Sequence, residues 1–338
     1  WFLHILDKNP VGESIKEKIF SLIDESFYKN WFDNWVRNFS LNLPEIWNDP
    51  SAKDLQIKNS KLHYSKHHPC IVIGRGPSLK KNQHLELLSK SDFKGTIICT
   101  DGALIPTLES GVTPKKFPNF FVCSVDGDEE IIRKLYDNEL VKKYGSEITG
   151  IFSILSNPTV VSFVKKMGIK IHWLHTLFDY NEGQKSFNQI SATMIRAKKN
   201  QGLPAIQTGG NVGTSSWFIA WRILKCNVVC LIGIDHGWNE DDSWDLIMSH
   251  GGVCELPKFN KNDKIFKELF PKIHNPDFNT NCIQDPVFQY YSSALKEFIS
   301  RSPENITTIN ATEGGCIFGD RIHSIKFKDF LKKYNEIL

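Results

Sequence analysis

A glycine-rich turn follows the first strongly apolar run of the chain and has residue types that bind phosphate. The run 70–73 leads directly into Gly74, Gly76, Pro77 and Ser78. Glycines let a ligand approach the backbone, while Pro and Ser suit the first turn of a helix, whose N–H groups and dipole attract anions. We predict that these four residues bind the phosphates of a nucleotide. The turn lacks the Gly-Lys-Ser/Thr ending of a Walker A loop, and an ordinary strand-to-helix turn is the alternative.

Acidic residues follow the next two apolar runs. Asp101 and Gly102 come after the second run, and Asp126 and Asp128 after the third. Carboxylates at neighbouring strand ends would converge on one edge of a sheet, where they could bind ribose hydroxyls or Mg²⁺. We predict that Asp101 and Gly102 bind nucleotide and that Asp126 is catalytic, with Asp126 and Asp128 as metal ligands in a Mg²⁺-dependent reaction. Ordinary turn chemistry, and helix capping by Asp128, are the alternatives.

A second glycine-rich loop precedes another helical pattern. Its small polar side chains and N–H groups suit contacts with phosphate, base or sugar, although helix capping alone would also explain them. The predicted nucleotide-binding residues of this loop are Thr208, Gly209, Gly210, Asn211 and Thr214.

A third group of polar residues ends the apolar run 228–233. Asp235 and His236 have side chains suited to acid–base chemistry, and His250 lies further along in a polar segment. We predict that Asp235, His236 and His250 are catalytic, with a structural role as the alternative for each histidine. We expect residues 312–315 to close the same cleft.

The elements that must position these residues alternate between strand and helix. Continuous apolar runs are typical of parallel strands covered on both faces, and helical patterns such as 129–144 and 217–224 separate them. This succession predicts an α/β fold: a Rossmann-like, doubly wound, mostly parallel sheet with helices on both faces and ligands at the carboxyl ends of the strands. The predicted strands are 70–73, 96–100, 120–125, 148–155, 170–174, 228–233 and 306–309.

Residues 1–66 are predicted to form a separate N-terminal helical segment ahead of a domain at 67–338. The helical pattern is expected to break at Pro44 and again at residues 48–51. The polar segments 175–206 and 239–286 are expected to be lids or insertions over the site. Helices are predicted over 287–300 and from residue 327.

Composition restricts the class of protein. The net charge of +3 gives no reason to expect a nucleic-acid partner. No apolar run approaches the roughly 18–20 residues of a membrane span. The eight cysteines form no CxxC pair, which favours a reducing compartment and hence the cytoplasm.

The order of motifs resembles the 6-hydroxymethylpterin diphosphokinase MptE-like family, which includes the Maf (motility accessory factor) glycosyltransferase-like proteins. The resemblance covers roughly residues 69–240 and rests on five stretches. These are Gly74–Leu79, Thr100–Ala103, Ser124–Asp128, Leu231–Asp235 and the Maf-like tail Asn310–Gly315.

The resemblance implies two chemistries that share a nucleotide site. Maf-like proteins resemble sialyltransferases that use CMP-activated sugars, and the loop at 208–212 and the tail at 313–315 are closer to that branch. The pterin branch transfers diphosphate from ATP, with Mg²⁺, to a pterin hydroxymethyl group. We predict a transferase, favouring a glycosyltransferase that takes a nucleotide-activated donor and a small-molecule, glycan or protein acceptor. A non-catalytic nucleotide-binding scaffold is the third hypothesis, motivated by the helical start and the polar insertions.

Overall fold

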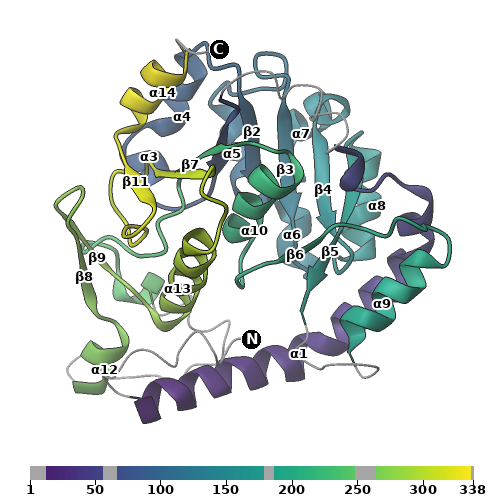
Figure 1. Cartoon of the computed structure of the whole chain (residues 1–338), viewed down its shortest axis with the longest axis horizontal. Coiled ribbons are helices and arrows are strands. Elements are labelled where there is room, and N and C mark those ends of the chain that lie inside the picture. The colour runs from purple at the N-terminus through teal and green to yellow at the C-terminus, as the bar shows by residue number, and fades with distance from the viewer. Residues whose placement is uncertain (1–12, 56–66, 179–185, 248–263, 336–338) are drawn as a thin grey trace.

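The structure is a computed structural model that describes residues 13–55, 67–178, 186–247 and 264–335. Nine of the described strands form one sheet in the order β11-β10-β7-β1-β2-β3-β4-β5-β6, and every neighbouring pair is parallel (Figure 1). The strands are β1 (Pro69–Ile73), β2 (Thr96–Thr100), β3 (Phe120–Ser124), β4 (Thr149–Ser153), β5 (Lys170–Leu177), β6 (Ala205–Gln207), β7 (Val228–Ile232), β10 (Thr307–Asn310) and β11 (Ile322–Ser324). Strands β8 (Lys272–Asn275) and β9 (Thr280–Ile283) pair as a separate antiparallel hairpin.

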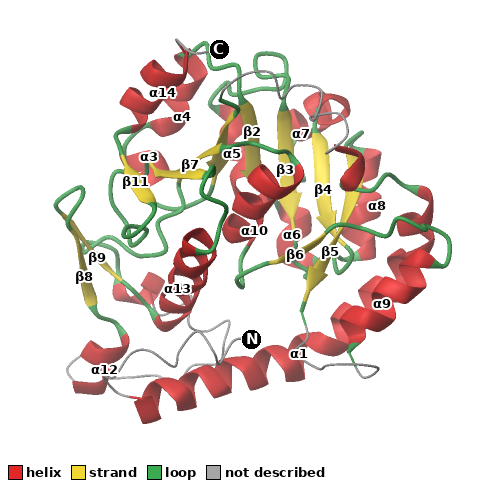
Figure 2. Ribbon diagram, viewed as in Figure 1, coloured by secondary structure: helices red, strands yellow, loops and turns green. Residues whose placement is uncertain are grey.

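Both faces of the sheet are buried, because alternate residues of each strand enter two different hydrophobic cores. In β1, Ile71 and Ile73 belong to one core, while Cys70 and Val72 belong to the other. The connecting helices cover both faces (Figure 2), as a doubly wound sheet requires. The predicted α/β, Rossmann-like fold class is therefore confirmed.

The first core lies under the helices that connect β1 to β6, together with the helix at the C-terminus. These are α3 (Ser78–Lys81), α4 (His84–Lys90), α5 (Asp101–Glu109), α6 (Glu130–Lys134), α7 (Glu139–Tyr144), a 3₁₀ turn (Gly145–Glu147), α8 (Pro158–Lys166), α9 (Phe187–Arg196) and α14 (Phe327–Asn335). The second core lies under α10 (Val212–Phe218), its π-helical continuation (Ile219–Ile223) and α13 (Pro286–Ser300). The short α12 (Lys264–Leu269) precedes the β8–β9 hairpin.

The long helix α1 (Glu13–Asn48) joins the first core through its C-terminal part. Phe39 and Ile46 are fully buried there. The Asn38 amide donates to the carbonyls of Gly127 and Leu155, at 3.1 and 3.0 Å. Residues 38–55 thus share a core with the sheet, and the division of the chain at residue 66 stays a prediction. None of the described helices, α1 included, is both long and apolar enough to span a membrane.

The expected break at Pro44 is wrong, because α1 continues through this proline to Asn48. A proline inside a helix removes one hydrogen bond. The burial of Leu43 and Ile46 on either side of it offsets that loss.

All seven predicted strands are present, with small shifts at their ends. The short strands β6, β8, β9 and β11 were not predicted, because each has only three or four residues and mixed polarity. The predicted helix 129–144 is two helices, α6 and α7, with a cap at Asn138, whose side chain accepts from the Leu140 N–H.

The order in which strands are added to the sheet changes direction at β1. From β1 it builds outward through β2 to β6, and it then returns to place β7 on the other side of β1. In open parallel sheets, ligands bind outside the carboxyl ends of the strands at such a switch point. The crevice beyond β1 and β7 is therefore the first place to look for a site.

Candidate functional site

A pocket opens beyond the carboxyl ends of β1 and β7. Its walls come from four segments far apart in the sequence: 77–82, 235–239, 280–282 and 312–315. The open space that it outlines, including its mouth, is about 370 Å³.

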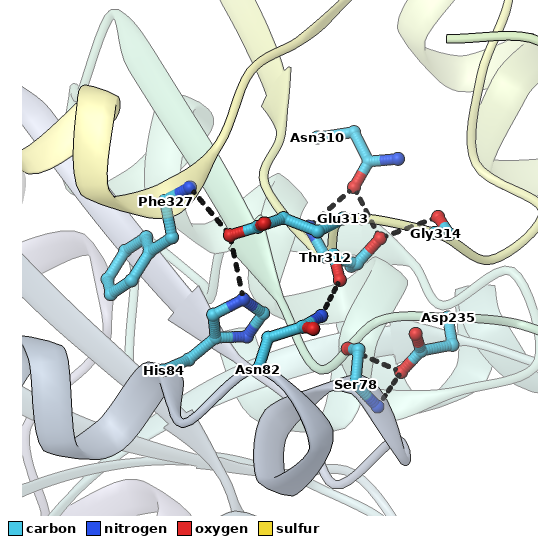
Figure 3. Close-up of polar contacts among 9 residues, drawn as sticks. All are labelled: Ser78, Asn82, His84, Asp235, Asn310, Thr312, Glu313, Gly314 and Phe327. Atoms are coloured by element: carbon cyan, nitrogen blue, oxygen red, sulfur yellow. Dashed lines mark hydrogen bonds and ion pairs between the residues drawn. The ribbon is translucent and has the colours of Figure 1, made fainter. Parts of the chain in front are cut away.

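Ser78 and Asp235 meet in this pocket (Figure 3). The Ser78 hydroxyl donates to Asp235 Oδ2 at 2.9 Å, and the Ser78 backbone N–H lies 3.4 Å from the same oxygen. Asp235 is only 6 % exposed, and this burial raises the pKa of its carboxyl to about 7, against which the hydroxyl acts. A carboxyl group with a pKa near neutrality, at the edge of a pocket, suits general acid–base chemistry.

The two glycines after β1 lie where two loops cross at close range. The Gly74 N–H donates to the Ile232 carbonyl and the Gly76 N–H to the Gly233 carbonyl, both at 2.8 Å. A side-chain carbon on Gly76 would lie 2.0 Å from Asp235 Oδ2. This geometry gives both glycines a packing role. Both N–H groups are already hydrogen-bonded to main-chain carbonyls, and nucleotide binding by Gly74 and Gly76 stays a prediction.

The far wall of the pocket is the loop after β10, which a polar network holds in place (Figure 3). The Asn82 amide donates to the Thr312 carbonyl at 2.9 Å, and the Thr312 hydroxyl bonds to both Asn310 and Gly314. Glu313 adopts a left-handed backbone with φ 60°. The expectation that residues 312–315 border the same cleft as Asp235 is confirmed.

The Glu313 carboxylate lies next to a buried histidine. His84 is fully buried, and its Nε2 is 3.5 Å from Glu313 Oε1, which also accepts from the Phe327 N–H at the start of α14. Burial lowers the pKa of His84, although the Glu313 carboxylate opposes this shift. The pair joins the pocket wall to α4 and α14.

Asp101 is held at the end of β2, next to the switch point but outside the pocket lining. Its carboxylate accepts from the Ser124 hydroxyl at 2.9 Å and from the Gly102 N–H at 2.8 Å. Burial raises the pKa of Asp101 to about 6, and the charge of Asp126 acts in the same direction. Asp101 and Asp126 are thus electrostatic neighbours, as their positions at successive strand ends predict.

Asp126 and Asp128 each bind backbone N–H groups of the turn after β3. Asp126 accepts from the Asp128 N–H at 3.0 Å, and Asp128 accepts from the Ile131 N–H at 2.7 Å. The second bond is the helix-capping contact that was the alternative for Asp128. Across the described residues, no three carboxylate, histidine or cysteine side chains are grouped so as to hold a metal ion.

The second glycine-rich loop precedes α10 and does not line the pocket. Asn211 caps α10 by accepting from the Thr214 N–H at 2.8 Å, and its amide donates to the Thr214 hydroxyl at 3.0 Å. A side-chain carbon on Gly210 would lie 2.6 Å from the Tyr291 ring. Capping and close packing are thus the contacts formed by this loop, and nucleotide binding by Thr208, Gly209, Gly210, Asn211 and Thr214 stays a prediction.

The His236 side chain points away from the pocket. Its ring stacks on Phe288, with centroids 5.9 Å apart, and contacts Tyr291 on α13. Its backbone is left-handed, with φ 45°, so that the residues on either side, Asp235 and Gly237, line the pocket while the His236 ring does not. His250 lies outside the described residues.

Several pocket residues carried no specific sequence signal. Lys81 places an exposed cation at the rim, and Trp238 forms part of the wall, with its indole N–H bonded to Asp285 at 2.7 Å. The hairpin residues 280–282 were missed because the hairpin itself was not predicted. The sequence does place Lys81 one helical turn after Ser78, and this spacing could have indicated that both side chains lie on the same face of the helix.

The parallel sheet and its switch point define an α/β protein of the Rossmann-like class, with a pocket at the carboxyl ends of β1 and β7. Comparison with known proteins assigns the family. The model of the 6-hydroxymethylpterin diphosphokinase MptE-like family matches residues 37–241, more than half of the chain, and the chain belongs to this family. The match begins within α1. No curated protein sequence matches the chain.

A solved structure with a similar fold is that of the Maf glycosyltransferase from Magnetospirillum magneticum AMB-1. The superposition covers 81 % of this chain and 37 % of that one, with a TM-score of 0.52 and 15 % sequence identity. This chain therefore spans well under half the length of that enzyme. At such identity the likeness shows the fold alone.

Proposed function

We propose that this protein is a nucleotide-dependent transferase, and specifically a glycosyltransferase that uses a nucleotide-activated sugar such as a CMP-sugar. The observation that carries the proposal is the buried Ser78–Asp235 pair at the switch-point pocket. The family and the Maf-like fold support the class of reaction. The acceptor would be a hydroxyl group of a small molecule, glycan or protein. The described cysteines are free, which supports a reducing, cytoplasmic location.

In the proposed reaction Asp235 acts as the general base. The acceptor oxygen forms a bond to the anomeric carbon as the bond from that carbon to the donor phosphate breaks. Asp235 takes the acceptor proton, and the nucleotide leaves with the bonding electron pair. With a pKa of about 7, Asp235 is partly ionised at neutral pH and can hold a proton once transferred. Lys81 at the rim would attract the phosphates.

Calorimetry with CMP, CDP, UDP and ATP tests the nucleotide site. We expect at least one nucleotide to bind, and replacement of Lys81 by alanine to weaken its affinity about tenfold, as the loss of one charge-assisted contact would. Lys80→Ala is the matched control, because Lys80 is an equally exposed neighbour on α3 that does not line the pocket. Absence of binding by all four nucleotides, or equal affinities of the two variants, would contradict the proposal.

A second candidate is Mg²⁺-dependent diphosphate transfer from ATP to a 6-hydroxymethylpterin. The family model carries that name, and Asp101 and Asp126 lie close enough to interact at the ends of β2 and β3. Mg²⁺ commonly uses one or two carboxylates together with substrate phosphates, so the absence of a larger cluster in the described residues is compatible with it. AMP release from ATP in the presence of the pterin, abolished by chelation of Mg²⁺, would favour this candidate over sugar transfer.

A further inference from the structure

Two cysteines from separate segments meet in the wall of the pocket. Cys282 lies on β9, and Cys316 directly follows the loop 312–315. Their sulfur atoms are 2.7 Å apart, although both cysteines are free thiols in this structure. Both side chains are almost fully buried, and Cys282 itself lines the pocket. A disulfide requires a sulfur–sulfur distance of about 2.05 Å, so only a small shift separates the pair from a covalent bond.

Hydrogen bonds fix the positions of the two segments that carry these cysteines. The Asn275 amide, on β8, donates to the carbonyls of Gly314 and Gly315 at 3.2 and 2.9 Å. The Cys316 N–H donates to the Asp235 carbonyl at 2.8 Å. These hydrogen bonds join the hairpin to the loop 312–315 and the end of that loop to residue 235. They therefore hold the two sulfur atoms next to each other.

The surroundings also favour reaction at Cys282. The two cysteines are hydrogen-bonded to each other, and this bond lowers the pKa of Cys282. The Lys296 ammonium acts in the same direction, while burial and the charges of Asp235 and Glu240 oppose it. The pKa of Cys316 is raised, chiefly by the same hydrogen bond. A thiol with a lowered pKa next to a second thiol suits thiol–disulfide exchange, in which a thiolate is the attacking group.

We propose that Cys282 and Cys316 form a reversible disulfide that joins two walls of the pocket, with a low-molecular-weight disulfide such as oxidised glutathione as the oxidant. The Cys282 thiolate attacks one sulfur of the oxidant and releases one thiolate. Cys316 then loses its proton to solvent and attacks Cys282, releasing the second thiolate. In total, two protein thiols are oxidised and one external disulfide is reduced to two thiols. This site goes beyond the proposed transferase activity and does not depend on it.

The other described cysteines are less suited to this chemistry. Cys99, Cys123 and Cys230 lie inside strands of the sheet, and burial raises the pKa of each. Cys70 and Cys226 form a second pair. Burial opposes ionisation of Cys226, but hydrogen bonds with Cys70 and His68 lower its pKa to about 6. Both cysteines are fully buried and lie outside the pocket lining, so a dissolved oxidant has no open route to them. Cys254 lies outside the described residues.

The test is oxidation of the folded chain of residues 1–338 with oxidised glutathione, followed by alkylation, peptide mapping by mass spectrometry and thermal denaturation. We expect a cross-linked Cys282–Cys316 peptide that excess reduced glutathione reverses. Closing this loop should raise the melting temperature by about 5 °C. Cys254→Ser should show the same rise, and Cys282→Ser and Cys316→Ser should show none.

Three outcomes would overturn the proposal. The first is a different pairing, such as Cys70–Cys226, as the main product. The second is a glutathione adduct at Cys282 that Cys316 never resolves. The third is a Cys282–Cys316 bond that forms only in denaturant or resists reduced glutathione. Nucleotide calorimetry on the reduced protein is a separate measurement, so failure of the disulfide and failure of the transferase proposal can be told apart.

Discussion

The Asp235 side chain lies in an environment that opposes its negative charge. Burial raises its pKa from 3.8 to about 7, so the folded protein holds this proton more tightly than the unfolded chain does. The resulting contribution to stability is fully present below about pH 4 and is lost as the pH rises through about 7. Above about pH 7, the ionised Asp235 carboxylate therefore lowers the stability of the folded state. Such a loss of stability is common for functional groups.

We expect Asp235→Asn to separate stability from activity. Asparagine cannot ionise but can still accept the Ser78 hydroxyl, so at pH 8 the variant should be more stable than the parent by up to roughly 3 kcal/mol. The difference should vanish near pH 4. Transferase activity should fall at least about 100-fold, because the proposed base is lost. Denaturant titrations at both pH values and an activity assay measure these effects.

Asp241→Asn provides the matched control for this experiment, since Asp241 is an exposed carboxylate in the same loop region. It should change neither stability nor activity appreciably. A loss of stability in Asp235→Asn at pH 8, or full activity, would contradict the assignment.

At the residue scale, the sequence predicted both members of the pair but not their contact. Ser78 was predicted to bind nucleotide as part of the turn that opens a helix, and Asp235 was predicted to be catalytic because it follows the apolar run 228–233. The glycines 74 and 76 suggested an open phosphate loop, whereas the crossing of two loops, which only the tertiary structure brings together, accounts for them. The sequence could not predict where the His236 ring points, because the direction of the ring depends on the left-handed backbone conformation of that residue.

At the scale of single elements, α1 carries two buried amides that bind the main chain of the sheet domain. Asn38 donates to the carbonyls of Gly127 and Leu155, and Asn42 donates to the Ser156 carbonyl at 2.6 Å. Both amides lie on the side of α1 that faces the carboxyl ends of β3 and β4. Asn38 connects α1 to the turn that includes Asp126 and Asp128, and both amides connect α1 to the turn after β4.

Replacing either amide with alanine should destabilise the protein by about 1–3 kcal/mol, because buried carbonyls lose their donors. Chemical denaturation of Asn38→Ala and Asn42→Ala measures this. The control is Ser40→Ala, whose exposed hydroxyl bonds only within α1, to the Val36 carbonyl. Equal stabilities of all three variants would show that α1 is not held by these contacts.

Elements were predictable where a local pattern determines them. The five-residue apolar strands β1, β2, β3 and β7 were found because the sheet buries them on both faces. The hairpin β8–β9 has short, partly buried strands of mixed polarity, whose pairing depends on cross-strand contacts that leave little trace in a single sequence. The continuation of α1 through Pro44 depends on packing against α8 and α9, and no local rule includes that.

For the whole molecule, residues 31–55 contribute to the hydrophobic core. Their contribution predicts which shortened chains should still fold. Phe39, Ile46 and Ala52 are fully buried, and Phe32 packs on Phe187 of α9. A chain of residues 31–338 should unfold cooperatively, whereas a chain of residues 67–338 should lose cooperative unfolding or aggregate. Thermal melts followed by circular dichroism compare the two. Similar, cooperative melts would instead support an independent domain beginning at residue 67.

The four walls of the pocket also have a consequence for biosynthesis. Strands β1 to β6 can pair as they leave the ribosome, since each lies next to its predecessor in the sheet. Asp235 reaches Ser78 only when β7 returns to β1, and the wall at 312–315 arrives later still, with β10. A nascent chain would therefore carry a largely formed sheet without a complete pocket. The ability to bind a ligand would be among the last properties that the protein acquires during its synthesis.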